Sequence, residues 1–245
     1  MGNGPTSEER ALFDEIAQLA DVVWEKSKDI AGTMADPKFV SVILFKRLRS
    51  NQRGYAVLWK NECYIEGEII VRCAVETAIC LAANSKMGDK FPRLVLRDAA
   101  ATLRGQIKLH KEAGDAERVE STEAALHHLE AKFAEGETAA FLHWKSLAEA
   151  GEAPLLYNFH KMLSGMSSHV TGLSLIRGLG DDETEELQSE LLSLSSRNYF
   201  NMMAGAALHG VLLQAGMIDD SDAAAAAMAL INRLNDLSMN WPGAE

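Results

Sequence analysis

The chain has 245 residues, and 24 Lys and Arg against 35 Asp and Glu give it a net charge of −11. Hydrophobic residues make up 47% and charged residues 24%, which is typical of a folded globular protein and excludes general disorder. The acidic balance excludes a dedicated duplex-DNA binder, because neutralising backbone phosphates requires clustered Lys and Arg. The composition favours helices over sheets, and we predict a single all-α bundle of about seven to nine helices.

The N-terminal region is charged and lacks the apolar segment of a secretory signal. The longest apolar run, residues 69–83, is shorter than a membrane span and contains two charged residues. Cys63, Cys73 and Cys80 lie in or next to this run, and an odd number of cysteines there indicates reduced, buried thiols. We therefore expect a cytoplasmic protein without membrane association, metal or cofactor.

The first predicted helices are separated by clear turn signals. Residues 1–7 are expected to be a flexible leader, and Ser7 is expected to cap a helix that runs to about Ile30. Asp36-Pro37 is a good start for the second helix. The polar face of that helix carries three arginines, Arg47, Arg49 and Arg53. A basic stripe of this kind is most often a solvated face.

The third predicted helix, about residues 62–84, is the most informative segment. Its charged residues all fall within one arc, and the remainder is almost wholly apolar: Glu62, Glu66, Glu68, Arg72 and Glu76. A helix that is apolar around most of its circumference is buried on most sides. We therefore expect this helix at the centre of the bundle.

Two helices, about 89–112 and 116–135, follow as a hairpin. The second is rich in glutamate, so residues 115–137 are expected to form an exposed acidic arm. His127-His128 lies on this arm, but adjacent residues on a helix diverge in direction, which favours a surface position over a metal site.

The C-terminal part is predicted to contain three more helices. The first begins at Pro154 and ends near Ser168, and residues 171–182 then form a glycine-rich loop. Asp182, or less favourably Thr184, caps a long helix that reaches about Ala215. The last helix extends from Ser221 to Leu237.

Arg72 and Glu76 stand one helical turn apart on the most apolar helix, where an unpaired charge is costly. One interpretation is an internal ion pair that sets the register of the helix. The other is an arginine held by Glu76 to receive an anion or to orient a catalytic group. Glu68 and Glu62 would extend the polar stripe toward solvent.

A second polar stripe lies on the helix that begins at Pro154. Its members recur at helical spacing and share one face: Tyr157, Lys161, Ser164 and Ser168. His169 follows at the end of this helix, where the helix dipole favours a histidine for structural reasons alone. A Ser–His hydrolase is disfavoured, because Ser168 and His169 are adjacent and no nucleophile-elbow glycines flank the serine.

Residues 43–83 resemble the bacterial domain of unknown function 5677 family. The matching text is Leu48-Arg49, Ala56-Val57-Leu58 and the Arg72-Cys73-Ala74-Val75-Glu76 core of that family's Arg-x-x-x-Glu helix. The stretch from Tyr157 to Ser164, with Ser168-His169, is similar to the family's Tyr…Ser…His helix, so the resemblance covers about half of the chain. It implies a helical bundle without assigned activity in which five side chains form one polar cluster: Arg72, Glu76, Tyr157, Ser164 and His169.

The family is similar in character to HEPN-type helical proteins, many of which are metal-independent ribonucleases in toxin and phage-defence systems. Their signature is an arginine followed several residues later by a histidine, and Arg104 with His110 fits it. About one such match is expected by chance in a chain of this composition. Gly105 also replaces the polar residue usual after the arginine, so we assign no role to this pair.

Two functional hypotheses follow. In the first, a polar pocket binds or cleaves a phosphate-bearing ligand, RNA or nucleotide, in stress or phage defence. The pocket would use catalytic His169, Arg72 and Glu76, with Tyr157, Lys161, Ser164 and Ser168 for binding. In the second, the chain is a non-enzymatic scaffold that forms a homodimer through the small residues of 204–210 and 223–227 and its ten methionines.

Overall fold

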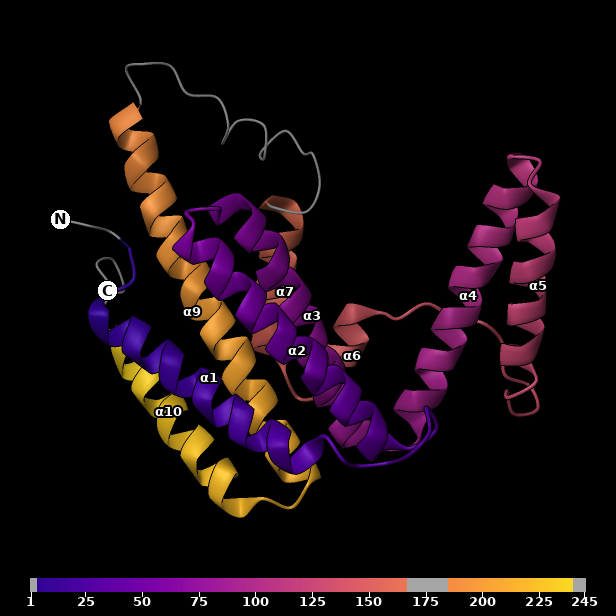
Figure 1. The fold of residues 1–245 in the computed structure, drawn as a ribbon, viewed down its shortest axis with the longest axis horizontal. Coiled ribbons are helices and arrows are strands. Elements are labelled where there is room, and N and C mark those ends of the chain that lie inside the picture. Colours follow the sequence, from indigo (N-terminus) through magenta and orange to yellow (C-terminus); the bar gives the residue numbers. More distant parts are fainter. Residues whose placement is uncertain (1–3, 167–184, 240–245) are drawn as a thin grey trace.

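The computed structural model describes residues 4–166 and 185–239. These residues form nine α-helices and no strand, which confirms the all-α bundle (Figure 1). The helices are α1 Ser7–Ser27, α2 Pro37–Lys60, α3 Tyr64–Met87, α4 Lys90–Glu112, α5 Ala116–Glu130, α6 Trp144–Ala150, α7 Pro154–Met166, α9 Glu185–Met217 and α10 Ser221–Met239. None of these helices within the described ranges is long and apolar enough to cross a membrane.

Helix α3 lies at the centre of the bundle, as its apolar circumference predicts. It packs against α2, α9, α6 and α7, and its last turns contact α4. An almost unbroken run of its residues from 74 to 84 is buried. The polar arc differs from the prediction in one respect: Glu62 and Glu66 are exposed, but Glu68 is buried instead of extending toward solvent, and its charge acts on the phenol of Tyr55.

Helix α1 begins one residue earlier than predicted, because Ser7 is its first residue and not its N-cap. Thr6, not Ser7, is the N-cap: its hydroxyl accepts the backbone N–H of Glu9 at 3.1 Å, and Glu9 Oε2 accepts the N–H of Thr6 at 2.7 Å. Pro5 is buried, and its carbonyl accepts a hydrogen bond from Arg10. The described part of the expected leader is therefore packed and capped. At α2 the predicted start is confirmed, with Asp36 as the cap and Pro37 in the first turn.

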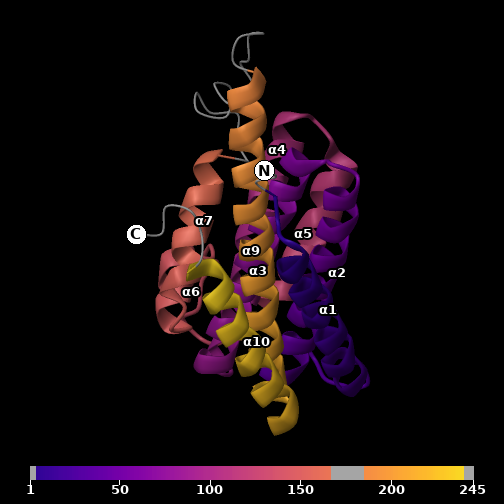
Figure 2. The ribbon, with the colours of Figure 1, turned by 90° about the vertical axis from the view of Figure 1, so that its left-hand side faces the viewer.

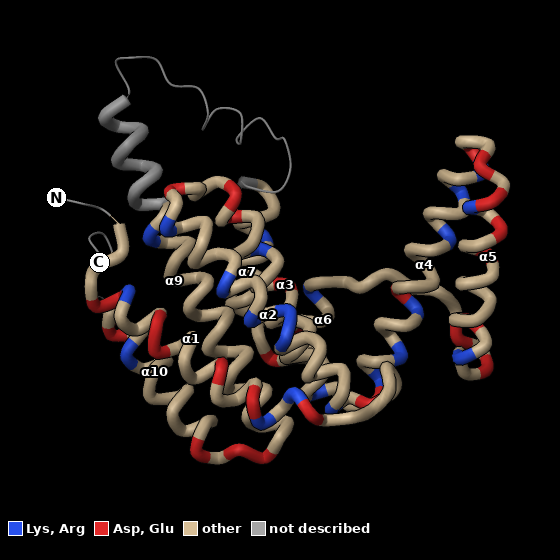
Figure 3. The backbone as a smooth tube through the Cα atoms, in the orientation of Figure 1, with Lys and Arg blue, Asp and Glu red and all other residues tan. Residues whose placement is uncertain are grey.

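Helices α4 and α5 form a hairpin that stands apart from the other helices (Figure 1). Helices α1, α9 and α10 pack against one another on the opposite side of the molecule, which faces the viewer in Figure 2. Helix α5 buries none of its residues. Ion pairs link the two helices, with Arg104 Nη2 2.7 Å from Glu130 Oε1 and Lys111 Nζ 2.7 Å from Glu123 Oε1. Basic residues lie along α4 and acidic residues lie along α5, as Figure 3 shows by colour on the two helices.

Helix α6 was not predicted from the sequence. It has seven residues, and its N-cap His143 makes no side-chain capping bond. Two turns are too few for a hydrophobic period to be recognised. Tertiary packing stabilises this helix instead. Leu147 and Ala148 are buried, and Gly151, the residue after the helix, packs against the backbone of α3.

The small residues of α9 and α10 are used inside the chain. A Cβ at Gly210 would clash with the side chain of Leu48, so α2 and α9 are in close contact there. Ala223 and Ala227 are buried against the same part of the bundle as Ala20 and Val23 of α1. Most of the small residues that suggested a homodimer therefore pack within one chain, whereas Ala225 and Ala226 are exposed.

The cysteines differ in burial. Only Cys80 is buried, and burial raises its pKa to about 12, which makes it an inert thiol. Cys63 and Cys73 are partly exposed, which corrects the expectation that all three are buried. All three are free thiols.

Candidate functional site

The predicted pair on α3 forms. Arg72 Nε donates a hydrogen bond to Glu76 Oε1 at 3.0 Å, across one helical turn. Both side chains are about one-fifth exposed, so the pair lies at the boundary between the core and solvent. This contact agrees with both interpretations of the pair, a structural ion pair and an arginine held to receive an anion. The residues around the pair distinguish the two.

His160 of α7 approaches the same oxygen atom. Its Nε2 lies 3.2 Å from Glu76 Oε1, and the residue is only 6% exposed. His160 was not among the predicted site residues, although it lies three positions after Tyr157 and four before Ser164 and so shares their helix face. That shared face was the signal that could have identified it.

Two aromatic rings hold the imidazole of His160. The ring of Tyr157, one turn earlier on α7, is stacked on it with a centroid distance of 6.1 Å. The indole of Trp144 from α6 lies 5.4 Å away and is tilted by 36°. Because rings from two helices contact the imidazole, its orientation is set before any ligand arrives.

The environment keeps His160 neutral. Burial lowers its pKa below 6.5, and the charge of Arg72 acts in the same direction. The Glu76 carboxylate opposes this shift but does not overcome it. A neutral imidazole has one protonated nitrogen and one acceptor nitrogen. With the proton on Nε2 facing Glu76, Nδ1 is the acceptor.

The cluster leaves hydrogen-bonding capacity unused. Both ring nitrogens of His160 are buried, and neither makes a well-directed hydrogen bond within the described part of the chain. Arg72 uses only Nε, so its two Nη atoms have no protein acceptor among residues 4–166 and 185–239. Buried unpaired polar atoms are rare in native proteins, so the two ring nitrogens of His160 indicate a water or a ligand, whereas the Nη atoms of Arg72 are accessible to solvent. This arrangement can therefore bind an anion at Arg72 and exchange a proton at His160.

The other predicted site residues fall into three groups. Tyr157 contacts His160, as described above, and Ser164 donates its hydroxyl hydrogen to the backbone carbonyl of His160 at 2.7 Å. Lys161 is exposed on the next position of α7. Ser168 and His169 lie outside the described residues.

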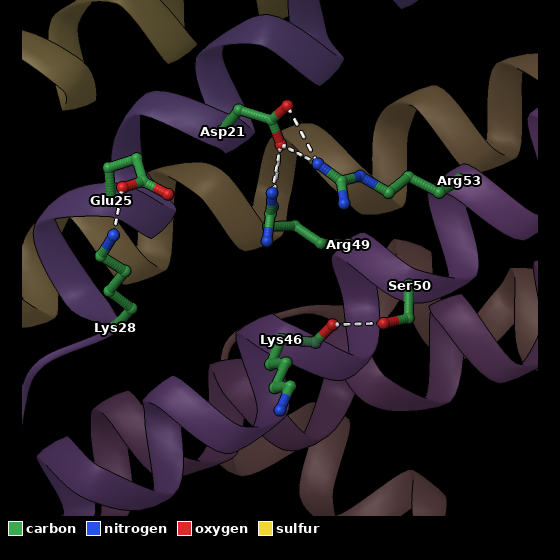
Figure 4. Close-up of polar contacts among 7 residues, drawn as sticks. All are labelled: Asp21, Glu25, Lys28, Lys46, Arg49, Ser50 and Arg53. Atoms are coloured by element: carbon green, nitrogen blue, oxygen red, sulfur yellow. Dashed lines mark hydrogen bonds and ion pairs between the residues drawn. The ribbon is translucent and has the colours of Figure 1, made fainter.

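The basic stripe of α2 is partly neutralised by α1. Arg49 and Arg53 both donate hydrogen bonds to Asp21, and Figure 4 shows this carboxylate between the two guanidinium groups. The guanidinium of Arg49 also lies 5.1 Å above the ring of Trp24. Arg47, in contrast, is exposed and has no ion pair in the described structure, and its charge acts on Cys80 of α3.

The Arg104–His110 pair does not form a site. Arg104 pairs with Glu130 of α5, and the six-residue separation places His110 on another side of α4. Among the described residues, no group of three or more His, Cys, Asp or Glu side chains is arranged to hold a metal ion.

Comparisons with known proteins identify no relative: no family model, no curated protein and no solved structure matches the chain. The resemblance to the domain of unknown function 5677 family stays a prediction from the motifs at Arg72–Glu76 and Tyr157–Ser164.

Proposed function

We propose that this chain binds a phosphate-bearing ligand, RNA or nucleotide, at the free edge of Arg72, with His160 as the acid–base group. One observation carries the proposal. Glu76 Oε1 lies within 3.2 Å of both Arg72 Nε and His160 Nε2, yet among residues 4–166 and 185–239 the Nη atoms of Arg72 have no acceptor and neither ring nitrogen of His160 makes a well-directed hydrogen bond. A purely structural ion pair would leave fewer donors unused.

The charges around the cluster favour an anion. Glu76 balances Arg72, and the charge of Lys161, which has no ion pair within the described ranges, acts on His160. Lys161 therefore adds one positive charge beside this neutral pair, although the whole chain has a net charge of −11. A planar guanidinium with two free N–H edges suits the oxygen atoms of a phosphate.

His160 supplies the chemistry that binding alone does not require. In RNA cleavage, its neutral Nδ1 would accept the proton of a 2′-hydroxyl, whose oxygen then attacks the adjacent phosphorus. The bond from phosphorus to the 5′-oxygen breaks, and that oxygen leaves with a proton from solvent. Arg72 would stabilise the charge that develops on the phosphate oxygens. His169 and Ser168 stay predicted members of the site.

The experiment is a binding titration with three probes: inorganic phosphate, a nucleoside monophosphate and a short single-stranded RNA. We expect Arg72→Gln to weaken binding by about 10- to 100-fold, because it removes a charged hydrogen-bond donor. Arg104→Gln is the matched control, since it removes another paired arginine on α4 without touching the cluster.

RNA cleavage is followed in the same samples. His160→Gln is expected to abolish cleavage while binding changes by less than about tenfold. Equal affinity of the wild-type protein and Arg72→Gln for all three probes would refute the proposal.

A further inference from the structure

The outer sides of α2 and α3 form an exposed surface that mixes apolar and basic residues. We call this surface the α2–α3 face and define it by Arg47, Gly54, Val57, Ile65 and Ile69. Val57 is 62% exposed, Ile65 61% and Ile69 44%, which is unusual for three large apolar side chains on adjacent helices. Clustered exposed apolar residues indicate a protein partner more than a free nucleotide.

No described residue packs closely enough against Gly54 to require a glycine at this position. It lies in the middle of α2, where glycine costs helix stability relative to alanine. A Cβ at this position would meet no atom within 4 Å. A glycine on an outward helix face lets another backbone approach closely, so the position suits a helix from outside.

The α4–α5 hairpin carries a complementary surface on the outer side of α5. Val119 and Leu126 of α5 are half-buried toward α4, whereas Glu117 and Ala124 lie on the opposite side and are exposed. Glu117 has no ion pair in the described structure, in contrast to Glu123 and Glu130.

The spacings on the two surfaces agree. Glu117 and Ala124 are two turns apart on one side of α5, and Arg47 and Gly54 are two turns apart on one side of α2. Each separation corresponds to about 10 Å along a helix axis. A helix laid along α2 can therefore place its carboxylate at Arg47 and its small residue at Gly54 at the same time.

We propose that the α2–α3 face binds the outer side of α5 from a second copy of the chain. The hairpin stands away from its own bundle (Figure 1), so two copies can exchange hairpins reciprocally about a twofold axis. In this dimer, α5 of each hairpin contacts the bundle of the other copy, so the two α4 helices face each other between the bundles. Leu109, which lies on the side of α4 away from the buried Ile107 and is 64% exposed, is covered there.

The test is sedimentation equilibrium of the full chain without ligand, so its result does not depend on the proposed function. We expect a dimer, and we expect Arg47→Glu or Glu117→Arg alone to raise the dimer dissociation constant at least tenfold. The double variant, with the charges exchanged, restores dimerisation. A chain that is monomeric at all concentrations, or a dimer that neither single variant weakens, overturns the proposal.

A glycine substitution separates the dimer contact from folding. Gly54→Ala is expected to raise the melting temperature of the monomer, because it removes a helix-interior glycine, yet to weaken the dimer by placing a methyl group in the contact. Gly216→Ala, whose Cβ also meets nothing within 4 Å, is the control and leaves dimerisation unchanged. If Gly54→Ala leaves the dimer unchanged, α5 does not lie at this position.

Discussion

Glu76 Oε1 on α3 lies 3.2 Å from His160 Nε2 on α7, and this contact joins two polar helix faces that are far apart in the sequence. The same oxygen accepts the hydrogen bond of Arg72. One carboxylate thus positions a cation and an imidazole, and neither uses all of its donors or acceptors within the described part of the chain. The proposed function depends on this shared oxygen.

The contact predicts that the pKa of His160 changes when the carboxylate of Glu76 is neutralised. The charge of Glu76 raises the pKa of His160, against the larger effect of burial. Glu76→Gln should therefore lower the pKa of His160 further, which NMR of the imidazole measures directly. Glu130→Gln, which neutralises an exposed carboxylate on the hairpin, should leave that pKa unchanged. An unchanged or raised pKa in Glu76→Gln would show that the contact is absent in solution.

Mild acid should destabilise the fold through two histidines. Burial lowers the pKa of His160 and of His209 below 6.5 in the folded chain. As pH falls below 6.5, the unfolded chain binds protons that the folded chain does not, so the free energy of unfolding decreases until the folded pKa values are reached. Urea denaturation from pH 7.5 to 5 should show this loss in the wild type. It should be smaller in a His209→Gln variant, and an equal loss would contradict the assignment.

A buried carboxylate near the N-terminus should matter at lower pH. Burial acts to raise the pKa of Glu9, but hydrogen bonds from Thr6, Asn201 and Arg197 outweigh it and lower the pKa below 4.5. The stabilisation is therefore complete above about pH 4.5 and is lost as pH falls through the folded pKa.

Glu9→Gln removes this stabilisation at neutral pH. It neutralises the buried carboxylate whose two oxygens accept the hydrogen bond of Arg197 Nε, and we expect a loss of about 3 kcal/mol in the free energy of unfolding. Chemical denaturation at pH 7 measures it. Glu15→Gln, in an exposed ion pair with Arg233, should cost less than about 1 kcal/mol. Similar losses in the two variants would contradict the buried network.

Gly151 sets how closely α6 approaches α3. A Cβ at this position would lie 2.7 Å from the backbone nitrogen of Ala83, and backbone atoms cannot move aside cheaply. Gly151→Ala should therefore destabilise the fold by about 1–3 kcal/mol. It should also displace Trp144, which changes the tryptophan fluorescence. Gly105→Ala, whose Cβ meets nothing within 4 Å, should not destabilise the chain. Equal stability of Gly151→Ala and the wild type would show that α6 is not held in this position.

The sequence predicts the parts of the fold that depend on local pattern. The apolar circumference of α3 places it at the centre, and Asp36-Pro37 marks the start of α2. Helix α6 is too short to show a period, and its position depends on Gly151 packing against α3. Such contacts between distant segments leave no local signal.

The sequence likewise predicts only part of the candidate site. Arg72 and Glu76 pair within one helix, so their spacing is sufficient to predict the contact. His160 was missed because its role depends on which side of α7 faces Glu76, and only the tertiary structure determines that. The burial of Glu68, whose charge acts on Tyr55, follows from the packing of α2 against α3.

The most direct test of the account is the pKa of His160 with and without ligand, measured by NMR. A phosphate group bound at Arg72 favours the imidazolium, so saturating nucleoside monophosphate should raise the pKa of His160, and binding should be tighter at pH 6 than at pH 8. Arg72→Gln should abolish the rise at the same ligand concentration. A pKa of His160 that does not change in the wild type at saturation would contradict the proposed site.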